Sequence, residues 1–157
     1  MTPNIGITAS QLQKSNDALA LVLANEMTLY VKTRKFHWNV SGESFMELHK
    51  LFESQYTALE AVIDEVAERI GKLGGKTIGT MSEYIALTQI KETPNRYPTQ
   101  KEMLTELLAD HEIVIVQIRK DVELLSKESN DIGTADFLTG VLETHETQSW
   151  ILRRYLN

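Results

Sequence analysis

The sequence predicts an all-α fold, a four-helix bundle whose one long connection carries a short extra helix. Only three prolines occur among the 157 residues, and none lies between positions 4 and 93, so long helices can form there. Apolar residues then recur at helical spacing over four long stretches, with Gly-, Ser- and Asn-containing breaks between them. Four amphipathic helices with one long connection are typical of a bundle with a crossover.

Capping boxes predict where the helices begin. In this pattern a hydroxyl side chain is followed three residues later by Glu or Gln, and the two satisfy backbone donors that the first turn leaves free. The four pairs are Ser10 with Gln13, Ser44 with Glu47, Thr80 with Glu83, and Thr99 with Glu102.

Breaks after each apolar stretch predict where the helices end. They lie at 39–42, 74–75 and 129–133. Together, starts and stops predict helices at 10–38, 44–73, 81–89, 99–127 and 132–156. We expect residues 10–157 to form one bundle domain, preceded by a flexible tail at 1–9.

Composition limits the class of protein. Hydrophobic residues make up 42% of the chain and charged residues 24%, which is ordinary for a globular domain. No apolar stretch approaches the roughly 20 residues that span a membrane, and the N-terminus lacks a signal-peptide pattern. Cysteine is absent, which excludes disulfides, thiolate chemistry and cysteine-bound metals. We expect a cytoplasmic protein with no membrane partner.

The charge balance disfavours a nucleic-acid-binding protein. Twenty-two acidic residues against sixteen basic ones give a formal net charge of −6. A dedicated nucleic-acid binder normally has a basic surface or tail. An acidic balance suits a protein that attracts cations, although colloidal solubility is the more ordinary explanation.

Two histidines and three carboxylates within one short stretch form the candidate site. They are His37, His49, Glu53, Asp64 and Glu68. A spacing of four puts His49 over Glu53, and Asp64 over Glu68, one turn apart on the same side of a helix. An imidazole–carboxylate pair and a carboxylate–carboxylate pair are suitable half-sites for a first-row metal such as iron.

The spacing between the two half-sites predicts that a second chain completes the site. At about 1.5 Å per residue, Glu53 and Asp64 lie roughly 16 Å apart along one helix. The ions of a two-metal centre are only about 3.5–4 Å apart. One straight helix therefore cannot bring both pairs to one site, whereas a second copy of the chain, antiparallel to the first, could.

A helical wheel of the predicted helix at 44–73 places its four candidate ligands on one stripe, away from the apolar stripe. These four are His49, Glu53, Asp64 and Glu68. Small residues beside them would allow another surface to approach closely; these are Thr57, Ala61, Ala67 and Gly71. A solvated acidic face is the ordinary interpretation of any single carboxylate. The spacing alone leaves a metal site and a solvated face both open.

Three polar residues interrupt the predicted apolar stripes of other helices: Glu26, His111 and His145. Because buried polar groups need partners, we expect a hydrogen-bonded cluster inside the bundle. The alternative is a metal site there. Di-iron sites of that kind use a Glu-x-x-His from each of two helices, and this sequence contains none, so such a centre is not expected.

The segment from Phe36 to Gly75 resembles the Dps mini-ferritins, the DNA-binding proteins from starved cells. The resemblance rests on Phe-His-Trp-Asn-Val-Ser-Gly at 36–42 and on Asp-Glu-Val-Ala-Glu-Arg-Ile-Gly-Lys-Leu-Gly-Gly at 64–75. It extends over the whole chain in the lengths of the predicted helices. It implies a ferritin-like four-helix bundle, a homo-oligomeric shell of twelve chains, and a ferroxidase that stores iron and protects against oxidative damage.

The resemblance also implies a role for each candidate ligand. His37, His49 and Glu53 would come from one chain, and Asp64 and Glu68 from its neighbour. Two ferrous ions would bind between them, and hydrogen peroxide, or more slowly dioxygen, would oxidise them. The family often has Asp at the position of Glu53. Zinc is a possible substitute for iron, because histidine and carboxylate ligands also suit it.

Further expected roles come from the same resemblance. Trp38 matches a tryptophan beside the family's site that takes up stray oxidising equivalents, and packing is its alternative role. Glu128, Asp131 and Asp136 lie where the family has acidic channels for iron. As alternatives, Asp131 would be a helix cap and Asp136 a solvated residue.

DNA binding is expected to be weak or absent, despite the family name. Members that bind DNA usually do so through a lysine-rich tail, and here the first 31 residues contain Lys14 as their only basic residue. Arg153 and Arg154 are the nearest substitute. The alternative function is a nucleoid-associated structural protein whose iron chemistry is incidental.

Overall fold

The structure, a computed structural model, describes residues 3–157. It contains five helices, which are α1 (Ala9–Asn39), α2 (Phe45–Lys72), α3 (Met81–Leu87), α4 (Gln100–Lys127) and α5 (Ile132–Leu156). Over the described residues no strand is present. Residues 1–2 of the predicted tail lie outside this range, and residues 3–8 precede α1. The predicted all-α fold is confirmed.

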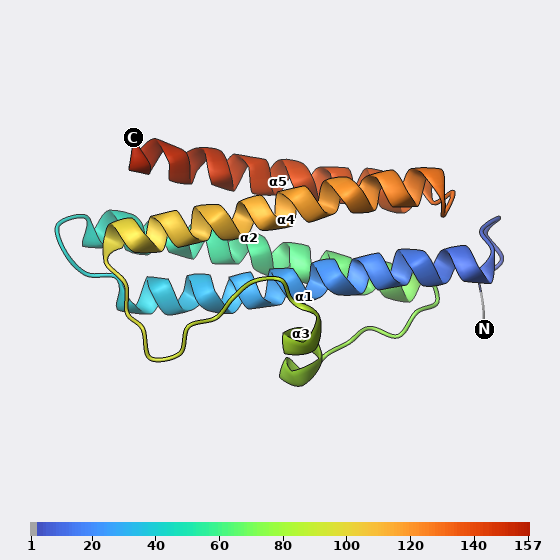
Figure 1. Cartoon of the computed structure of the whole chain (residues 1–157), viewed down its shortest axis with the longest axis horizontal. Helices are drawn as coiled ribbons and strands as arrows, with labels where there is room; N and C mark the ends of the chain where they lie inside the picture. The colour runs from blue at the N-terminus through green and yellow to red at the C-terminus, as the bar shows by residue number, and fades with distance from the viewer. Residues whose placement is uncertain (1–2) are drawn as a thin grey trace.

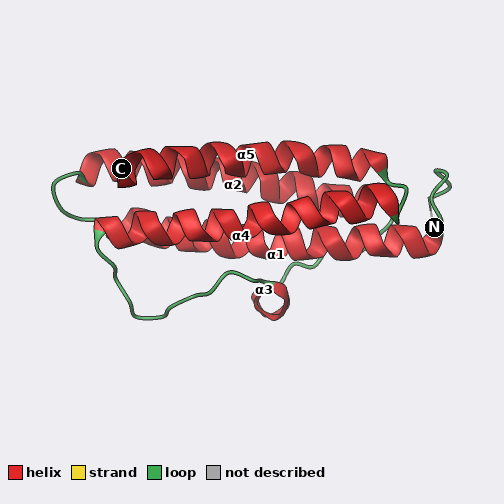
Figure 2. Cartoon of the chain, turned by 45° about the horizontal axis from the view of Figure 1, so that its top comes forward, coloured by secondary structure: helices red, strands yellow, loops and turns green. Residues whose placement is uncertain are grey.

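The four long helices lie side by side, and α3 lies outside the bundle beside α1 (Figures 1 and 2). Helix α1 runs antiparallel to α2, and the crossover that carries α3 returns the chain to the start of α4 (Figure 1). The predicted helix at 81–89 ends two residues early. The reason is Asn25 of α1, whose Oδ1 accepts from the backbone N–H of Gln89 at 2.7 Å and from the Thr88 hydroxyl at 3.2 Å.

The core runs along the bundle and receives side chains from all four long helices. Its largest fully buried members include Leu19, Leu23, Phe52, Leu59, Leu107, Ile118 and Leu138. Burying one such side chain stabilises a fold by about 1.5–3 kcal/mol, so these stripes hold the helices in register. Among the described residues, no helix has the length and apolarity needed to cross a membrane.

The predicted cap of α1 is wrong by two residues. Its capping box is Thr8 with Gln11, where the Thr8 side chain accepts from the Gln11 backbone and the Gln11 side chain accepts from the Thr8 N–H at 3.0 Å. Both this pair and Ser10 with Gln13 carry the sequence pattern. With the helix capped at Thr8, the preceding residue Ile7 packs against the core. A cap at Ser10 would not place Ile7 next to the helix start.

The predicted box at Ser44 is also wrong. Ser44 is the N-cap residue of α2, but its side chain makes no capping hydrogen bond. Its backbone (φ −93°, ψ 28°) lies outside the extended region from which a cap side chain reaches back to the helix. Thr80 and Thr99 have extended backbones, and both of their predicted boxes are confirmed.

Candidate metal centre

His37 and His49 stack on one another where α1 ends and α2 begins. Their ring centroids are 3.7 Å apart, with 19° between the ring planes. The short connection between two antiparallel helices brings these two residues, twelve positions apart in sequence, face to face. His37 is buried, with 8% of its surface exposed, and His49 is half-buried.

Each imidazole donates a hydrogen bond to the backbone of the other histidine. Nδ1 of His37 lies 2.8 Å from the carbonyl oxygen of His49, and Nδ1 of His49 lies 2.9 Å from the carbonyl oxygen of His37. A carbonyl oxygen only accepts, so both Nδ1 atoms carry a proton. In the neutral ring the Nε2 lone pair is then free, which is the arrangement that metal-binding histidines use.

Three aromatic side chains and one guanidinium lie beside the histidine pair. We call this group the wall; its members are Tyr30, Arg34, Trp38 and Tyr56. Tyr56 lies edge-on to the ring of His37, with centroids 5.3 Å apart, and Tyr30 lies edge-on to Tyr56 at 6.1 Å. The Arg34 guanidinium lies over Tyr56 at 4.7 Å and over Trp38 at 5.3 Å. It also donates to the Tyr30 hydroxyl at 2.6 Å. Sequence reasoning missed this wall, although Tyr30, Arg34 and Trp38 follow one another at a spacing of four.

The three candidate carboxylates lie exposed along α2. Glu68 pairs with Lys72 at 3.1 Å, a contact between exposed side chains that contributes little stability. Glu53 and Asp64 take part in no side-chain hydrogen bond or salt bridge with the rest of residues 3–157. Within that range, no three His, Asp or Glu side chains of one chain are grouped so as to hold a metal ion.

The cluster expected inside the bundle is confirmed as hydrogen-bonded. Nε2 of His145 lies 2.6 Å from Oε1 of Glu26, and the Nδ1 atoms of His111 and His145 lie 2.8 Å apart. All three side chains are fully buried. This cluster lies apart from the candidate ligands on α2.

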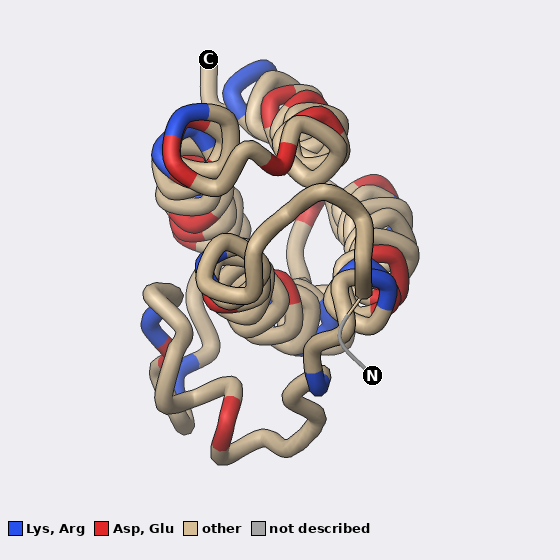
Figure 3. Tube along the Cα trace, turned by 90° about the vertical axis from the view of Figure 1, so that its right-hand side faces the viewer, with Lys and Arg blue, Asp and Glu red and all other residues tan. Residues whose placement is uncertain are grey.

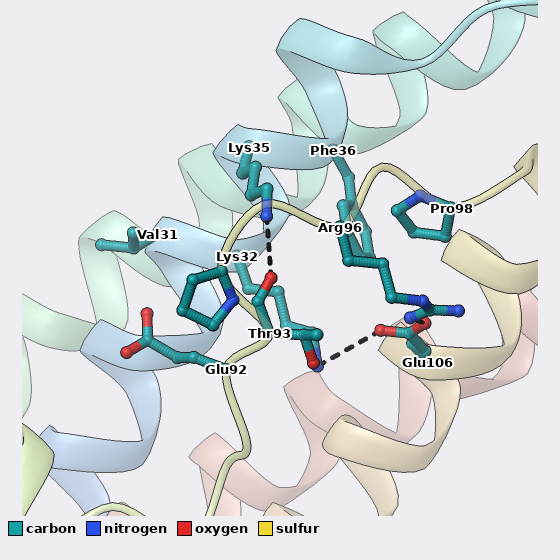
Figure 4. A pocket seen from close by; sticks show the side chains of 10 residues that line it. Val31, Lys32, Lys35, Phe36, Glu92, Thr93, Arg96, Pro98 and Glu106 are labelled. Carbon is teal, nitrogen blue, oxygen red and sulfur yellow. Dashed lines mark hydrogen bonds and ion pairs between the residues drawn. The ribbon is translucent and has the colours of Figure 1, made fainter.

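A cleft of about 230 Å³ lies between α1, the crossover and α4 (Figure 4). Its cations already have partners within the chain. Lys35 donates to the Thr93 carbonyl at 3.1 Å, Lys32 lies 3.7 Å from Glu106, and Arg96 also bonds to Glu106. None of the candidate metal ligands lines this cleft.

The three residues of the expected iron channel differ in their surroundings. Asp131 is 2% exposed, caps α5 by accepting from the Thr134 N–H at 3.0 Å, and lies 3.5 Å from the Arg69 guanidinium. Of the two roles expected for Asp131, a channel residue or a helix cap, the structure shows the helix cap. Glu128 is exposed and pairs with Lys14 at 2.7 Å, while Asp136 is exposed on α5.

The arrangement of the five helices is that of the ferritin-like class of proteins. The family model described as a ferritin-like domain matches residues 16–157. A low-temperature-induced protein of Nostoc is 42% identical, over 98% of this chain and 86% of its own length. DNA protection during starvation protein 2 of Bacillus anthracis is 37% identical, over 86% of this chain and 91% of its own length.

Solved structures agree with these relatives. Dps from Vibrio cholerae, described as a member of a broad superfamily of ferritin-like diiron-carboxylate proteins, matches with a TM-score of 0.92 and 35% identity, over 99% of this chain and 97% of that one. DpsC from Streptomyces coelicolor matches with a TM-score of 0.95 and 30% identity, over 100% of this chain and 91% of that one. This chain belongs to the Dps family.

Replacing Asp131 by Ala tests its role as the cap of α5. The substitution removes the α5 cap and a buried partner of Arg69, so the free energy of unfolding should fall by about 1–2 kcal/mol. Asp136→Ala, an exposed neighbour on the same helix, should change it by less than about 0.5 kcal/mol. Urea denaturation of both variants measures the difference. Equal stability of the two variants would contradict the cap role.

Proposed function

We propose that this protein is a ferroxidase that oxidises ferrous iron at a dinuclear site shared by two chains. Hydrogen peroxide, or dioxygen, is the oxidant, and ferric mineral is stored inside a hollow shell of twelve chains. The observation that carries the proposal is the pair of imidazole–carbonyl hydrogen bonds between His37 and His49, which leaves the Nε2 atom of each ring free for a metal.

The donor set suits ferrous iron. Nitrogen and oxygen ligands without thiolates are appropriate for Fe²⁺. His37 and His49 bind through Nε2, and Glu53 lies one turn beyond His49 on the same helix. Asp64 and Glu68 of a second copy supply the other half, because they lie too far along α2 to reach the histidines of their own chain. Three carboxylates offset most of the charge of two ferrous ions.

The chemistry follows from holding two ferrous ions together. Each gives one electron to hydrogen peroxide, which takes up two protons and becomes two water molecules, so no hydroxyl radical is released. The exposed carboxylates bind and orient the iron, and the Tyr56 ring holds the His37 imidazole in place. Metal affinity falls in acid as the ligands become protonated.

Trp38 and the acidic residues near the start of α5 have proposed supporting roles. Trp38 is 64% exposed and follows His37 directly, which suits a residue that takes up stray oxidising equivalents. Glu128 and Asp136 are exposed and could line a channel for iron. Asp131 is less suited to that role, because its carboxylate is buried and engaged.

Removing both imidazoles should abolish the fast phase of iron oxidation. In the double variant His37→Gly and His49→Gly, stopped-flow mixing of Fe²⁺ with peroxide should show only the slow background rate, because two of the five ligands are gone. Glu65→Gln, an exposed carboxylate beside Asp64 but off the ligand stripe, should keep the wild-type rate. Mass measurement in solution checks that each variant assembles normally. An unchanged rate in the double variant would remove the site assignment.

DNA binding at physiological salt should be weak or undetectable. Acidic and basic positions are interspersed around the helices (Figure 3), and Arg153 is already paired with Glu112 at 3.2 Å. Because residues 1–8 contain no lysine or arginine, they neutralise no phosphates, so any binding at low salt should be lost by roughly 150 mM. A mobility-shift assay on the assembled protein measures this. A clear shift at that salt would favour the nucleoid-associated alternative.

A further inference from the structure

Four fully buried polar side chains, one from each long helix, lie near the middle of the bundle. They are Glu26 of α1, Gln55 of α2, His111 of α4 and His145 of α5, and each is 0% exposed. Burying polar groups in an apolar core is costly unless they are hydrogen-bonded. The ferroxidase proposal uses none of the four, so their presence in the core needs a separate explanation.

The hydrogen bonds limit how many protons the three ionisable side chains hold. The Nδ1 atoms of His111 and His145 are 2.8 Å apart, so one donates and the other accepts. If His111 donates, both rings are neutral, and Glu26 either keeps an uncompensated buried negative charge or carries a proton on Oε2, which is buried with no acceptor among residues 3–157. If His145 donates, one more proton is shared between Glu26 and His145, and the cluster has no net charge. The second arrangement is favoured, because an uncompensated buried charge is expensive.

The neutral arrangement leaves His111 with a proton on Nε2 that needs an acceptor. That nitrogen is buried and has no hydrogen-bond partner among residues 3–157. Both amide atoms of Gln55 and the hydroxyl of Ser149 are also buried without a partner. A buried water typically makes about three hydrogen bonds to such atoms.

The helix register brings these atoms to neighbouring levels of the bundle. Helices α2 and α5 run antiparallel, and Arg69 of α2 donates to the Thr134 hydroxyl of α5 at 3.0 Å near one end. The number of residues from Arg69 back to Gln55 along α2 is almost equal to the number from Thr134 to Ser149 along α5. Gln55 and Ser149 therefore lie at about the same level of the bundle. His145, which contacts His111, lies one turn from Ser149 on α5.

We propose that the middle of the bundle is a hydrated, proton-sharing site. Glu26, His145 and His111 hold one shared proton without net charge, and a buried water joins His111 Nε2 to the Gln55 amide and the Ser149 hydroxyl. Water is a better occupant than a metal ion, because the ionisable side chains between residues 3 and 157 form no group suited to hold one. This site is independent of the proposed iron chemistry.

The site makes the bundle sensitive to acid. Burial, and then the nearby His145, hold the pKa of His111 well below the ordinary 6.5. Glu26 faces the cluster from α1 and His145 from α5, while Gln55 of α2 is neutral. Below about pH 6.5 an unfolded chain protonates this histidine and the folded chain does not, so stability falls as pH falls. A second proton would put N–H groups on both facing Nδ1 atoms and break the chain of hydrogen bonds.

Nitrogen-15 NMR of the histidine rings in the metal-free full-length chain tests the protonation states. The chain has four histidines, so substituting each in turn assigns every ring. His111 should remain neutral, with its proton on Nε2, at pH values where an ordinary histidine is already protonated, because its pKa is lowered by burial. Ordinary titration of His111 near pH 6.5, or a proton on its Nδ1 at neutral pH, would overturn the proposal. So would a Zn²⁺-induced shift of the His111 signal in the His37→Gly, His49→Gly chain.

Acid stability and a high-resolution crystal structure provide two further checks. Between pH 7.5 and 5.5, the unfolding midpoint of His111→Leu should fall less than that of the wild type, because the variant lacks the buried imidazole. The reverse pattern would contradict the assignment; if His111→Leu fails to fold, the ring NMR of the wild type decides. The crystal structure should show a water within hydrogen-bond distance of His111 Nε2. If no water lies at His111 Nε2, or if Gln55 forms a direct hydrogen bond with that atom, the proposed water site is wrong.

Discussion

The candidate metal centre depends on the two hydrogen bonds that His37 and His49 donate to each other's backbone carbonyls. These bonds require that α1 and α2 run antiparallel and that a short connection joins them. They place a proton on Nδ1 of each ring and leave each Nε2 as a possible ligand. Because the acceptors are backbone atoms, the helix pairing itself orients the imidazoles. Tyr56 packs edge-on against His37, and the Arg34 guanidinium lies over the Tyr56 ring, so Tyr56 restricts the movement of His37.

The protein has two polar centres of different kinds. One lies at the α1–α2 surface, where exposed carboxylates can meet a second chain. The other lies inside the bundle, where the histidine rings use their nitrogens on each other and on Glu26 instead of presenting them to a common point. The proposed iron site lies between chains for this reason. Among residues 3–157 no group of His, Asp or Glu side chains is placed to hold a metal ion, and the two surface half-sites lie far apart along one straight helix.

Much of the fold was predictable from the sequence, because proline positions, apolar periodicity and helix breaks all favour the same five helices. The buried cluster was also predictable, since Glu26, His111 and His145 interrupt apolar stripes. The caps at Ser10 and Ser44 were not, because one depends on how Ile7 packs and the other on a local backbone angle. The wall around His37 and the histidine tautomers depend on the register between helices, which no single-helix pattern contains.

The most direct measurement of the shared site mixes two chains that are each inactive. One carries His37→Gly and His49→Gly, the other Asp64→Ala and Glu68→Ala, and co-expression assembles them together. If each site takes its imidazoles from one chain and its acidic pair from another, about a quarter of the sites in a random mixture are intact. Ferrous oxidation should then recover to roughly a quarter of the wild-type rate. Hybrid assemblies that form but stay inactive would contradict a centre shared between chains.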